Sequence, residues 1–334
     1  MSNSIKRLFF LALITPFTIF SYEFSAMTLN VDNLFDTLDD IKKDDKAYLP
    51  IQFKQSDAHK KSCNRIRVNS WKNECLFLDW NEDTKNAKLR NIANSIISYG
   101  SNGPDIIALQ EVENNNILNQ LLELLRPYGF VDSVLIEGKD YRGIDTALIT
   151  KFKILDSKLH YIKFSGEFEG KDTRPILDAT LEINGEKIKI YNVHFPSGFH
   201  DVSMRVDSLN VLSKLLNSHD YPTIALGDFN VNTKEDNQLD IYESQEAFWS
   251  VAHIFGCKDC KGSFYYNYGK TWEFLDTIFL SKDRDISYIK DSIDIYRTKS
   301  NSYSDTGKPK NFNPTKKYGV SDHLPMVAKF RIIN

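Results

Sequence analysis

Short apolar runs separated by polar turns occur along most of the chain, and they predict a mixed α/β protein. Two of the runs flank Asn184-Gly185, a pair that strongly favours a two-residue β-hairpin. Other runs are followed by apolar residues at helical spacing, with Gly100 and Pro127 ending two of the predicted helices. A hairpin combined with several helices favours two packed mixed β-sheets flanked by helices over one all-parallel sheet. The predicted strands are residues 22–31, 105–112, 130–136, 145–150, 153–162, 174–183, 186–194, 223–229, 272–281 and 326–330, and the predicted helices are residues 84–99, 116–126 and 201–217.

A long polar segment lies between the first predicted strand and the first predicted helix. Residues 37–83 are charged and rich in asparagine and lysine, and they are too many for a simple connection, so we expect a functional or cross-linked excursion. The hydrophobic content of 41% is enough for a substantial core and excludes a disordered chain. We therefore expect a monomer with a single domain over residues 22–334 and an insertion at about 37–83.

The first residues have the pattern of an export signal. Lys6 and Arg7 precede an apolar run at residues 8–20, which is short for a membrane span, and Ser21 fits a cleavage position. We expect residues 1–21 to be removed and the protein to be secreted or periplasmic, without stable membrane insertion. Cleavage lowers Lys plus Arg from 42 to 40 against 45 acids, so the formal net charge changes from -3 to -5. The molecule as a whole therefore does not attract polyanions.

Four cysteines in an exported chain suggest disulfides. Four cysteines allow three pairings, and the sequence leaves the pairing open, although closeness along the chain suggests Cys63–Cys75 and Cys257–Cys260. The second spacing also occurs in redox and zinc sites. No second close cysteine pair or nearby histidine cluster completes a zinc set, so we expect structural cross-links.

Acidic, amide and histidine side chains stand where the predicted strands end. Buried carboxylates are costly unless they are paired or bound to a cation, so such a cluster indicates a metal site. Oxygen ligands suit Mg²⁺, Mn²⁺ or Ca²⁺ better than zinc, and two histidines among them suit proton transfer near neutral pH. Arg142 and Arg174 are candidates for clamping phosphate oxygens. The set fits metal-assisted attack of water on a phosphorus ester. The residues at the strand ends are Asn30, Asp32, Glu111, His194, Asp228, Asn230, Asp276, Asp322 and His323.

Six short motifs at these strand ends follow one another in an order that resembles a known series. The series is the signature of the endonuclease/exonuclease/phosphatase superfamily, and the resemblance extends over roughly residues 24–332. Each motif alone is weak evidence for the superfamily, whereas six motifs in the same order are specific evidence for it. The motifs are Leu29-Asn30-Val31-Asp32, Leu109-Gln110-Glu111-Val112, Asn192-Val193-His194-Phe195-Pro196-Ser197, Gly227-Asp228-Phe229-Asn230, Leu275-Asp276-Thr277-Ile278 and Ser321-Asp322-His323.

The resemblance implies a four-layer α/β sandwich with a Mg²⁺-dependent hydrolytic site at one end of the paired sheets. By its position in the motifs, Glu111 resembles the principal metal ligand. Asn30 and Asp322 would support the metal, and Asp32 would do so less directly. The implied cofactor is Mg²⁺, with Mn²⁺ or Ca²⁺ as alternatives.

The resemblance also implies which residues carry out catalysis. Asp228 and Asn230 would position or activate the attacking water and hold the phosphate. Asp276 would orient His323 and fix its tautomer. His194 is similar to the second histidine of the deoxyribonuclease I-like branch, where the abasic-site nucleases carry a tyrosine.

Two arginines are expected to contact the substrate phosphate. Arg174 opens a strand at the place where the deoxyribonuclease I-like branch carries a phosphate-binding arginine. Arg142 lies in a stretch that is common in secreted bacterial members of the superfamily and has no clear counterpart in deoxyribonuclease I.

These features predict an exported, divalent-metal-dependent phosphodiesterase that hydrolyses DNA, and as a second candidate RNA, by in-line attack of water. His194 would protonate or stabilise the leaving oxygen, but which histidine is acid and which is base stays open. A sphingomyelinase-like phospholipase C or an inositol-phosphate phosphatase could use the same site, because loops choose the substrate. A binding protein without catalysis is disfavoured because the set is complete. Residues 298–319 are rich in lysine and tyrosine. We expect a solvated loop there, and the alternative is a segment that binds a phosphate backbone.

Overall fold

The computed structural model describes residues 21–257, 259–282 and 284–333. The predicted export signal at residues 1–21 lies outside this part except for Ser21, which pairs with Ile333 at the start of the first strand. None of the described helices is long and apolar enough to cross a membrane.

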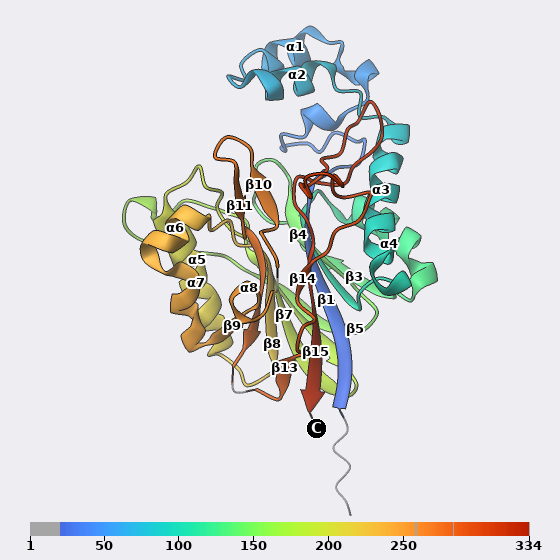
Figure 1. Cartoon of the computed structure of the whole chain (residues 1–334). Helices are drawn as coiled ribbons and strands as arrows, with labels where there is room; N and C mark the ends of the chain where they lie inside the picture. The colour runs from blue at the N-terminus through green and yellow to red at the C-terminus, as the bar shows by residue number, and fades with distance from the viewer. Residues whose placement is uncertain (1–20, 258, 283, 334) are drawn as a thin grey trace, which may run out of the picture.

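Two mixed β-sheets pack face to face and carry helices on their outer faces (Figure 1). The first sheet contains, in order, β13 (Ile286–Tyr288), β15 (Met326–Ile333), β1 (Ser21–Leu34), β2 (Ile106–Val112), β4 (Asp145–Thr150) and β3 (Asp132–Leu135), with β14 (Asp294–Ile295) beside β15. The second sheet contains, in order, β5 (Lys153–His160), β6 (Ile176–Ile183), β7 (Glu186–His194), β8 (Thr223–Asp228), β12 (Asp276–Ser281) and β9 (Trp249–Val251). A separate ribbon contains β10 (Phe264–Tyr266) and β11 (Thr271–Glu273).

Apolar clusters between successive layers hold the sandwich together. The helices are α1 (Asp57–Cys63), α2 (Asn69–Phe77), α3 (Glu82–Ile97), α4 (Asn115–Leu125), α5 (Val202–Leu216), α6 (Thr233–Leu239), α7 (Ile241–Ser244) and α8 (Ala252–Phe255). Between the sheets, Ala26, Ala108 and Leu226 are fully buried. Ile96 of α3 packs on the outer face of the first sheet, and Leu212 of α5 packs on the second. The four-layer α/β sandwich is confirmed, and its doubly covered strands explain the continuous apolar runs.

Parallel strand pairs gather the polar strand ends at one end of the molecule. β1 runs parallel to β2, and Asn30 pairs with Gln110 near their carboxyl ends. β7 runs parallel to β8, and His194 pairs with Asp228 at theirs. Asp276, at the start of antiparallel β12, pairs with Asp228 from the other side. β1 runs toward the end of the sheets where α1 and α2 stand, away from the C-terminus (Figure 1).

Two predicted elements are placed wrongly. The strand predicted at residues 272–281 is two strands, β11 and β12, because its halves pair with different partners: β11 pairs with β10 in the separate ribbon, whereas β12 pairs with β8 in the second sheet. The helix predicted to begin at Thr84 begins earlier, because the Asn81 side chain caps it by accepting a hydrogen bond from Thr84 N (3.0 Å). Both errors are local and leave the order of elements unchanged.

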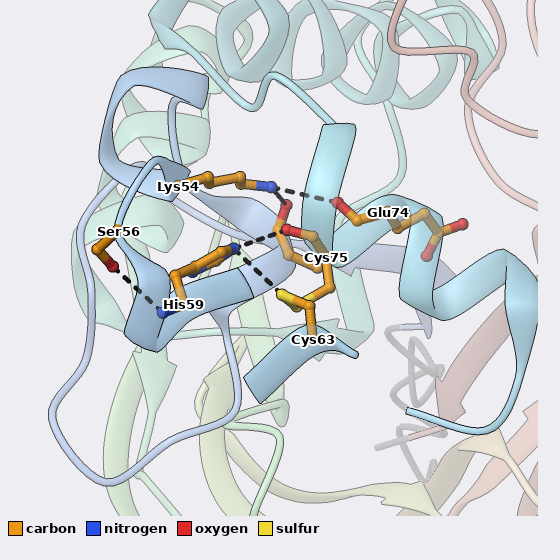
Figure 2. Close-up of a disulfide and its surroundings, with 7 residues drawn as sticks. Lys54, Ser56, His59, Cys63, Glu74 and Cys75 are labelled. Carbon is orange, nitrogen blue, oxygen red and sulfur yellow. Dashed lines mark hydrogen bonds between the residues drawn. A yellow bond between two sulfur atoms is a disulfide. The ribbon is translucent and has the colours of Figure 1, made fainter. Parts of the chain in front are cut away.

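The segment at residues 37–83, predicted as an insertion, is folded and contains α1 and α2. A disulfide joins α1 to α2 (Figure 2). The insertion packs on the sandwich through Trp80, whose indole nitrogen donates to Phe35 O (3.1 Å) directly after β1. The suggested cysteine pairing is that of the structure. The two disulfides are Cys63–Cys75 and Cys257–Cys260.

A buried amide joins the two sheets behind the predicted site. Asn192 donates from Nδ2 to Leu109 O (2.9 Å) and Ala147 O (2.8 Å), and its Oδ1 accepts from Gln110 Nε2 (2.7 Å). Asn192 and Gln110 are both buried. The bonds cross from β7 to β2 and β4, so they fix the spacing of the sheets next to Glu111.

We predict that Asn192→Leu lowers the free energy of unfolding by about 3 kcal/mol or more, because it leaves buried carbonyl and amide groups without partners. Urea or thermal unfolding measures the loss. Asn237→Leu on exposed α6 is the matched control and is expected to change stability by no more than about 0.5 kcal/mol. If the two variants had the same free energy of unfolding, the proposed stabilising role of the buried Asn192 hydrogen bonds between the sheets would be contradicted.

Candidate active site

The polar side chains predicted from the strand ends form one cluster. They come from the carboxyl ends of β1, β2, β7 and β8, the start of β12 and the segment before β15. Hydrogen bonds, close ion pairs or charge interactions connect all of them. The cluster contains Asn30, Asp32, Glu111, His194, Asp228, Asn230, Asp276, Asp322 and His323.

Glu111 is held in an uncommon backbone conformation. Its φ of 65° lies in the left-handed region, at a shift of register between β2 and β4. Residues other than glycine reach this region at a cost of about 1 kcal/mol or more, so the surrounding contacts must maintain it. Its Oε2 accepts from Asn33 N (3.0 Å), and its Oε1 lies 3.5 Å from Asn30 Nδ2. The irregularity re-aims the carboxylate at the end of the strand, as bulges next to active sites do.

Asn30 connects the first sheet to the second at the site. Its Nδ2 donates to Asp228 Oδ2 (3.1 Å), and its Oδ1 accepts from Asp32 N (3.0 Å). Its main-chain carbonyl accepts from Ser321 Oγ (2.7 Å), which joins the β1 end to the segment before β15. The amide oxygen has a second lone pair that is available to a cation.

Asp228 is fixed by its own turn. Its Oδ1 accepts from Asn230 N (2.9 Å). The preceding Gly227 has a φ of 147°, and a Cβ there would lie 2.0 Å from Val193 O, so only glycine lets β7 and β8 approach here. Burial, and then the like charge of Asp276, raise the pKa of Asp228 to about 7. A carboxylate with such a pKa can take a proton from water near neutral pH.

His323 and Asp276 form a buried pair. His323 Nδ1 donates to Asp276 Oδ2 at 2.6 Å, which fixes the tautomer and leaves Nε2 3.9 Å from Asp322 Oδ1. Burial opposes protonation of the imidazole, but the carboxylates of Asp276, Asp322 and Asp228 outweigh it and raise the pKa of His323 well above its usual range. His323 is therefore an imidazolium near neutral pH.

His194 has the opposite charge state. Its Nε2 lies 3.5 Å from Asp228 Oδ2 and 3.8 Å from Glu111 Oε1. Burial, followed by the positive charges of Arg174 and Arg142, lowers the pKa of His194 well below its usual range, so the ring is neutral. Its Nδ1 is buried and has no hydrogen-bond partner among the residues that the structure describes. A neutral and a charged imidazole therefore lie near the same carboxylate.

The two predicted phosphate-binding arginines are in different surroundings. Arg174 is buried and donates to His194 O (3.1 Å), to the next carbonyl along the chain (2.9 Å) and to Asp140 Oδ2 (3.2 Å). Its guanidinium is engaged by the protein and fixes the end of β7. Arg142 has a half-exposed side chain, and its Nη2 lies 4.0 Å from Glu111 Oε1. Arg142 is thus the arginine that can move to meet a phosphate.

A hard divalent cation fits the oxygen atoms of the cluster. Burial, and then the charges of Asp32 and Glu111, raise the pKa of Asp322 to about 7, although the positive charge of His323 opposes the shift. Carboxylate and amide oxygens are the ligands that Mg²⁺ prefers. Asn30, Asp32, Glu111 and Asp322 are the residues that would hold it.

A second group of side chains also has metal-ligand spacing. Asp228, Asp276 and His323 offer ligand atoms within 4.8 Å of one another. The short hydrogen bond between Asp276 and His323 occupies one atom of each, so we assign this trio to proton handling. A further trio, His59, Cys63 and Cys75, is excluded because both sulfurs are in a disulfide.

Three supporting residues have little signal in the sequence. Asn33 and Ser321 stand beside or within the motifs, and their bonds to Glu111 and Asn30 could be inferred only from position. Lys88 is a buried lysine of α3 that donates to Asp32 O. Burial lowers the pKa of Lys88, and nothing in its helical pattern marks it as part of the site.

Comparisons with known proteins place this geometry in context. A model described as the Endonuclease/Exonuclease/phosphatase family matches residues 77–331. No curated protein matches the sequence. Among solved structures, a protein of this family from Bacteroides thetaiotaomicron has a TM-score of 0.56 at 16% identity, covering 93% of this chain and 98% of that one.

Two other solved structures are similar over most of the chain. A humanized variant of D. rerio TDP2 has a TM-score of 0.57 at 16% identity, covering 92% of this chain and 98% of that one. The mannosyl-6-phosphatase of Bacteroides thetaiotaomicron VPI-5482 has a TM-score of 0.54 at 14% identity, covering 92% and 99%. At these identities the likeness concerns the fold.

Proposed function

The chain belongs to the endonuclease/exonuclease/phosphatase family, and on that premise we propose that it is an exported, divalent-metal-dependent phosphodiesterase that hydrolyses DNA and, as a second substrate, RNA. Members of this superfamily are phosphoric ester hydrolases that generally use divalent metal ions. The observation that carries the proposal is the convergence of two imidazoles, His194 and His323, on Asp228 beside the oxygen cluster at Glu111.

The metal site and the proton-handling groups divide the work. When bound at Asn30, Asp32, Glu111 and Asp322, a divalent ion supplies a Lewis acid that polarises a phosphoryl oxygen. Asp228, oriented by the main chain at Asn230, takes a proton from the attacking water. The two histidines act on the phosphate and on the leaving oxygen.

The two histidines have distinct tasks because their charges differ. His323, kept protonated by Asp276, donates from Nε2 to the phosphate and is the acid that can protonate the leaving oxygen. Neutral His194 donates a hydrogen bond from Nε2 toward a phosphoryl oxygen without competing for the proton. The sequence left the acid and base open; the bond from His323 to Asp276 and the arginine charges near His194 support this assignment.

A substrate panel tests the proposed function. Purified protein is incubated with plasmid, RNA, sphingomyelin, an inositol phosphate and a chromogenic phosphodiester, with Mg²⁺ or Mn²⁺ and with chelator. We expect chelator-sensitive nicking of plasmid. Release of phosphocholine or inorganic phosphate with plasmid untouched would instead favour the lipase or the phosphatase, and the similarity to a mannosyl-6-phosphatase supports the latter alternative.

Export is supported by the apolar run behind Lys6 and Arg7 and by the two disulfides. Expression of the full chain with a C-terminal tag, followed by N-terminal sequencing of the product from the periplasm or medium, tests it. A mature protein that begins near Ser21 is expected. An uncleaved product retained in the cytoplasm would contradict it.

Arg142→Ala is expected to raise KM for a DNA substrate about 10-fold, because a charge-assisted contact to phosphate is worth about 1.5 kcal/mol. Its melting temperature should stay unchanged, since Arg142 is half exposed. Arg174→Ala is the informative comparison, because loss of three buried bonds should lower the melting temperature. If Arg174→Ala raised KM at an unchanged melting temperature and Arg142→Ala left KM unchanged, then Arg174 would be the phosphate-binding arginine and Arg142 would not.

A further inference from the structure

The α1–α2 hairpin, residues 57–77, has almost no apolar core of its own. Of its side chains only His59, Cys63 and Cys75 are buried. The Cys63–Cys75 disulfide joins the two helices, and His59 Nε2 lies 2.8 Å from Cys75 O (Figure 2). Lys54 anchors the base by donating to Ala47 O (2.7 Å) and Glu74 O (3.2 Å). A covalent and polar framework thus holds a hairpin that is mostly surface.

The surface of the hairpin is strongly basic. Between Asp57 and Glu74 there is no acidic residue, although the whole chain has a net charge of -3. None of the basic residues in between forms an ion pair with any residue that the structure describes. Trp71, 57% exposed, lies among them. The basic residues are Lys60, Lys61, Arg65, Arg67 and Lys72.

A second basic segment lies beside the insertion at the same end of the molecule (Figure 1). Residues 298–319 contain five lysines and one acid, Asp305. Phe312 of this segment packs on Trp80 of the insertion, with ring centroids 6.0 Å apart. Asn91 Nδ2 also donates to Lys317 O (3.2 Å), which ties the segment to α3. Positive charge is therefore concentrated on two adjoining segments of a protein that is otherwise acidic.

The insertion also contacts the loop beside the active site. Lys43 Nζ donates to Asp140 O (3.0 Å), and Asp44 N donates to Tyr141 O (3.0 Å). The next residue in that loop is Arg142, whose guanidinium approaches the Glu111 carboxylate. One side-chain and one main-chain contact thus join the segment that carries the hairpin to the loop beside the catalytic cluster.

We propose that the α1–α2 hairpin and residues 298–319 form a nucleic-acid-binding face that holds the strand on one side of the scissile phosphate. The inference rests on the proposed nuclease function. Lysine and arginine neutralise backbone phosphates, and an exposed tryptophan offers a surface on which a base stacks. A polymer of phosphates can span both segments, whereas a single small phosphate ester cannot.

The tip of the hairpin favours nucleic acid over a membrane surface. The turn between the helices presents Arg65 and Arg67 beside exposed Val68, whereas the exposed aromatic side chains, Trp71 and Phe77, lie further along α2. Membrane-surface anchors carry apolar and aromatic groups at their leading edge. A tip formed by two guanidinium groups that have no ion-pair partner in the described part of the chain is suited to phosphate oxygens.

The test compares two variants with the same change in net charge. Arg65→Glu/Arg67→Glu reverses the hairpin tip, and Lys153→Glu/Lys187→Glu reverses two exposed lysines near the opposite end of the second sheet. Binding to a labelled DNA duplex in chelator is measured by fluorescence anisotropy over a range of salt. Circular dichroism and melting temperature confirm that both variants fold, and hydrolysis of a chromogenic phosphodiester reports the site.

We expect the tip variant to bind DNA at least about 10-fold more weakly and to lower the salt slope by about 1–2, because each lost phosphate contact removes about 0.9. Hydrolysis of the small diester should stay unchanged, and the control should bind like wild type. Equal binding by the two variants, while wild type still nicks plasmid, would overturn the inference and leave the nuclease standing. A wild type that cleaves only non-polymeric esters would overturn the proposed function itself. The wild type could also sediment with phosphatidylserine vesicles. If the tip variant lost this sedimentation but still bound DNA like wild type, the partner of this face would be a membrane and not nucleic acid.

Discussion

His323→Ala is expected to lower kcat on DNA by about 10³-fold, because it removes a positioned acid that a buried carboxylate keeps protonated. The physical basis is the 2.6 Å bond from His323 Nδ1 to Asp276 Oδ2, which holds Nε2 toward the cluster. Steady-state kinetics on a labelled duplex measures the loss. The loss in kcat should be much larger than the change in KM, since the proton is transferred in the transition state.

Asp276→Asn separates this role from a merely structural one. The variant keeps the shape of the side chain but removes the charge that raises the pKa of His323. A histidine with a lowered pKa loses its proton at lower pH, so the alkaline limb of the pH–kcat profile should move to lower pH. An unchanged profile together with a reduced melting temperature would show that the pair only stabilises the fold.

Glu111→Gln is expected to lower kcat/KM by about 10³-fold, since several kcal/mol of transition-state stabilisation depend on the metal that its carboxylate would hold. The change keeps volume and removes one negative charge from the cluster. Excess Mn²⁺ should restore part of the activity, because weakened metal affinity is offset by concentration.

The matched control is Glu113→Gln, two residues along the same chain. Glu113 is buried and accepts a hydrogen bond from Asp36 N (2.7 Å), so it belongs to the support of the β1 end and not to the site. Burial raises the pKa of Glu113 to about 9, so its carboxyl is already neutral at pH 7 and the amide changes little. Comparable losses in both variants would contradict a special role of Glu111.

The sequence predicts most of the cluster because strand ends are easy to locate. Asn30, Glu111 and Asp228 each stand near the end of a predicted strand, and parallel pairing brings such ends to one edge. The fold class follows from the same runs. The prediction of one strand at residues 272–281 was wrong because the change of partner from β10 to β8 depends on strands distant in sequence, which local alternation does not reveal.

Other features depend on tertiary contacts that leave no periodic signal. Arg174 matches its expected position, yet its donors are engaged by main-chain carbonyls and Asp140. Lys88 reads as an ordinary helix lysine, although its buried amine reaches Asp32 O. The charge states of His194 and His323 follow from burial and neighbours and could not be assigned from residue type.

Titration calorimetry with Mn²⁺ tests the central claim most directly, because it reports the metal site without any assumption about substrate. Wild-type protein should bind the ion saturably, Glu113→Gln should bind it equally well, and Glu111→Gln should bind it at least about 10-fold more weakly. Unaltered binding by Glu111→Gln, or no binding by the wild type, would contradict a metal-dependent site at this end of the sheets.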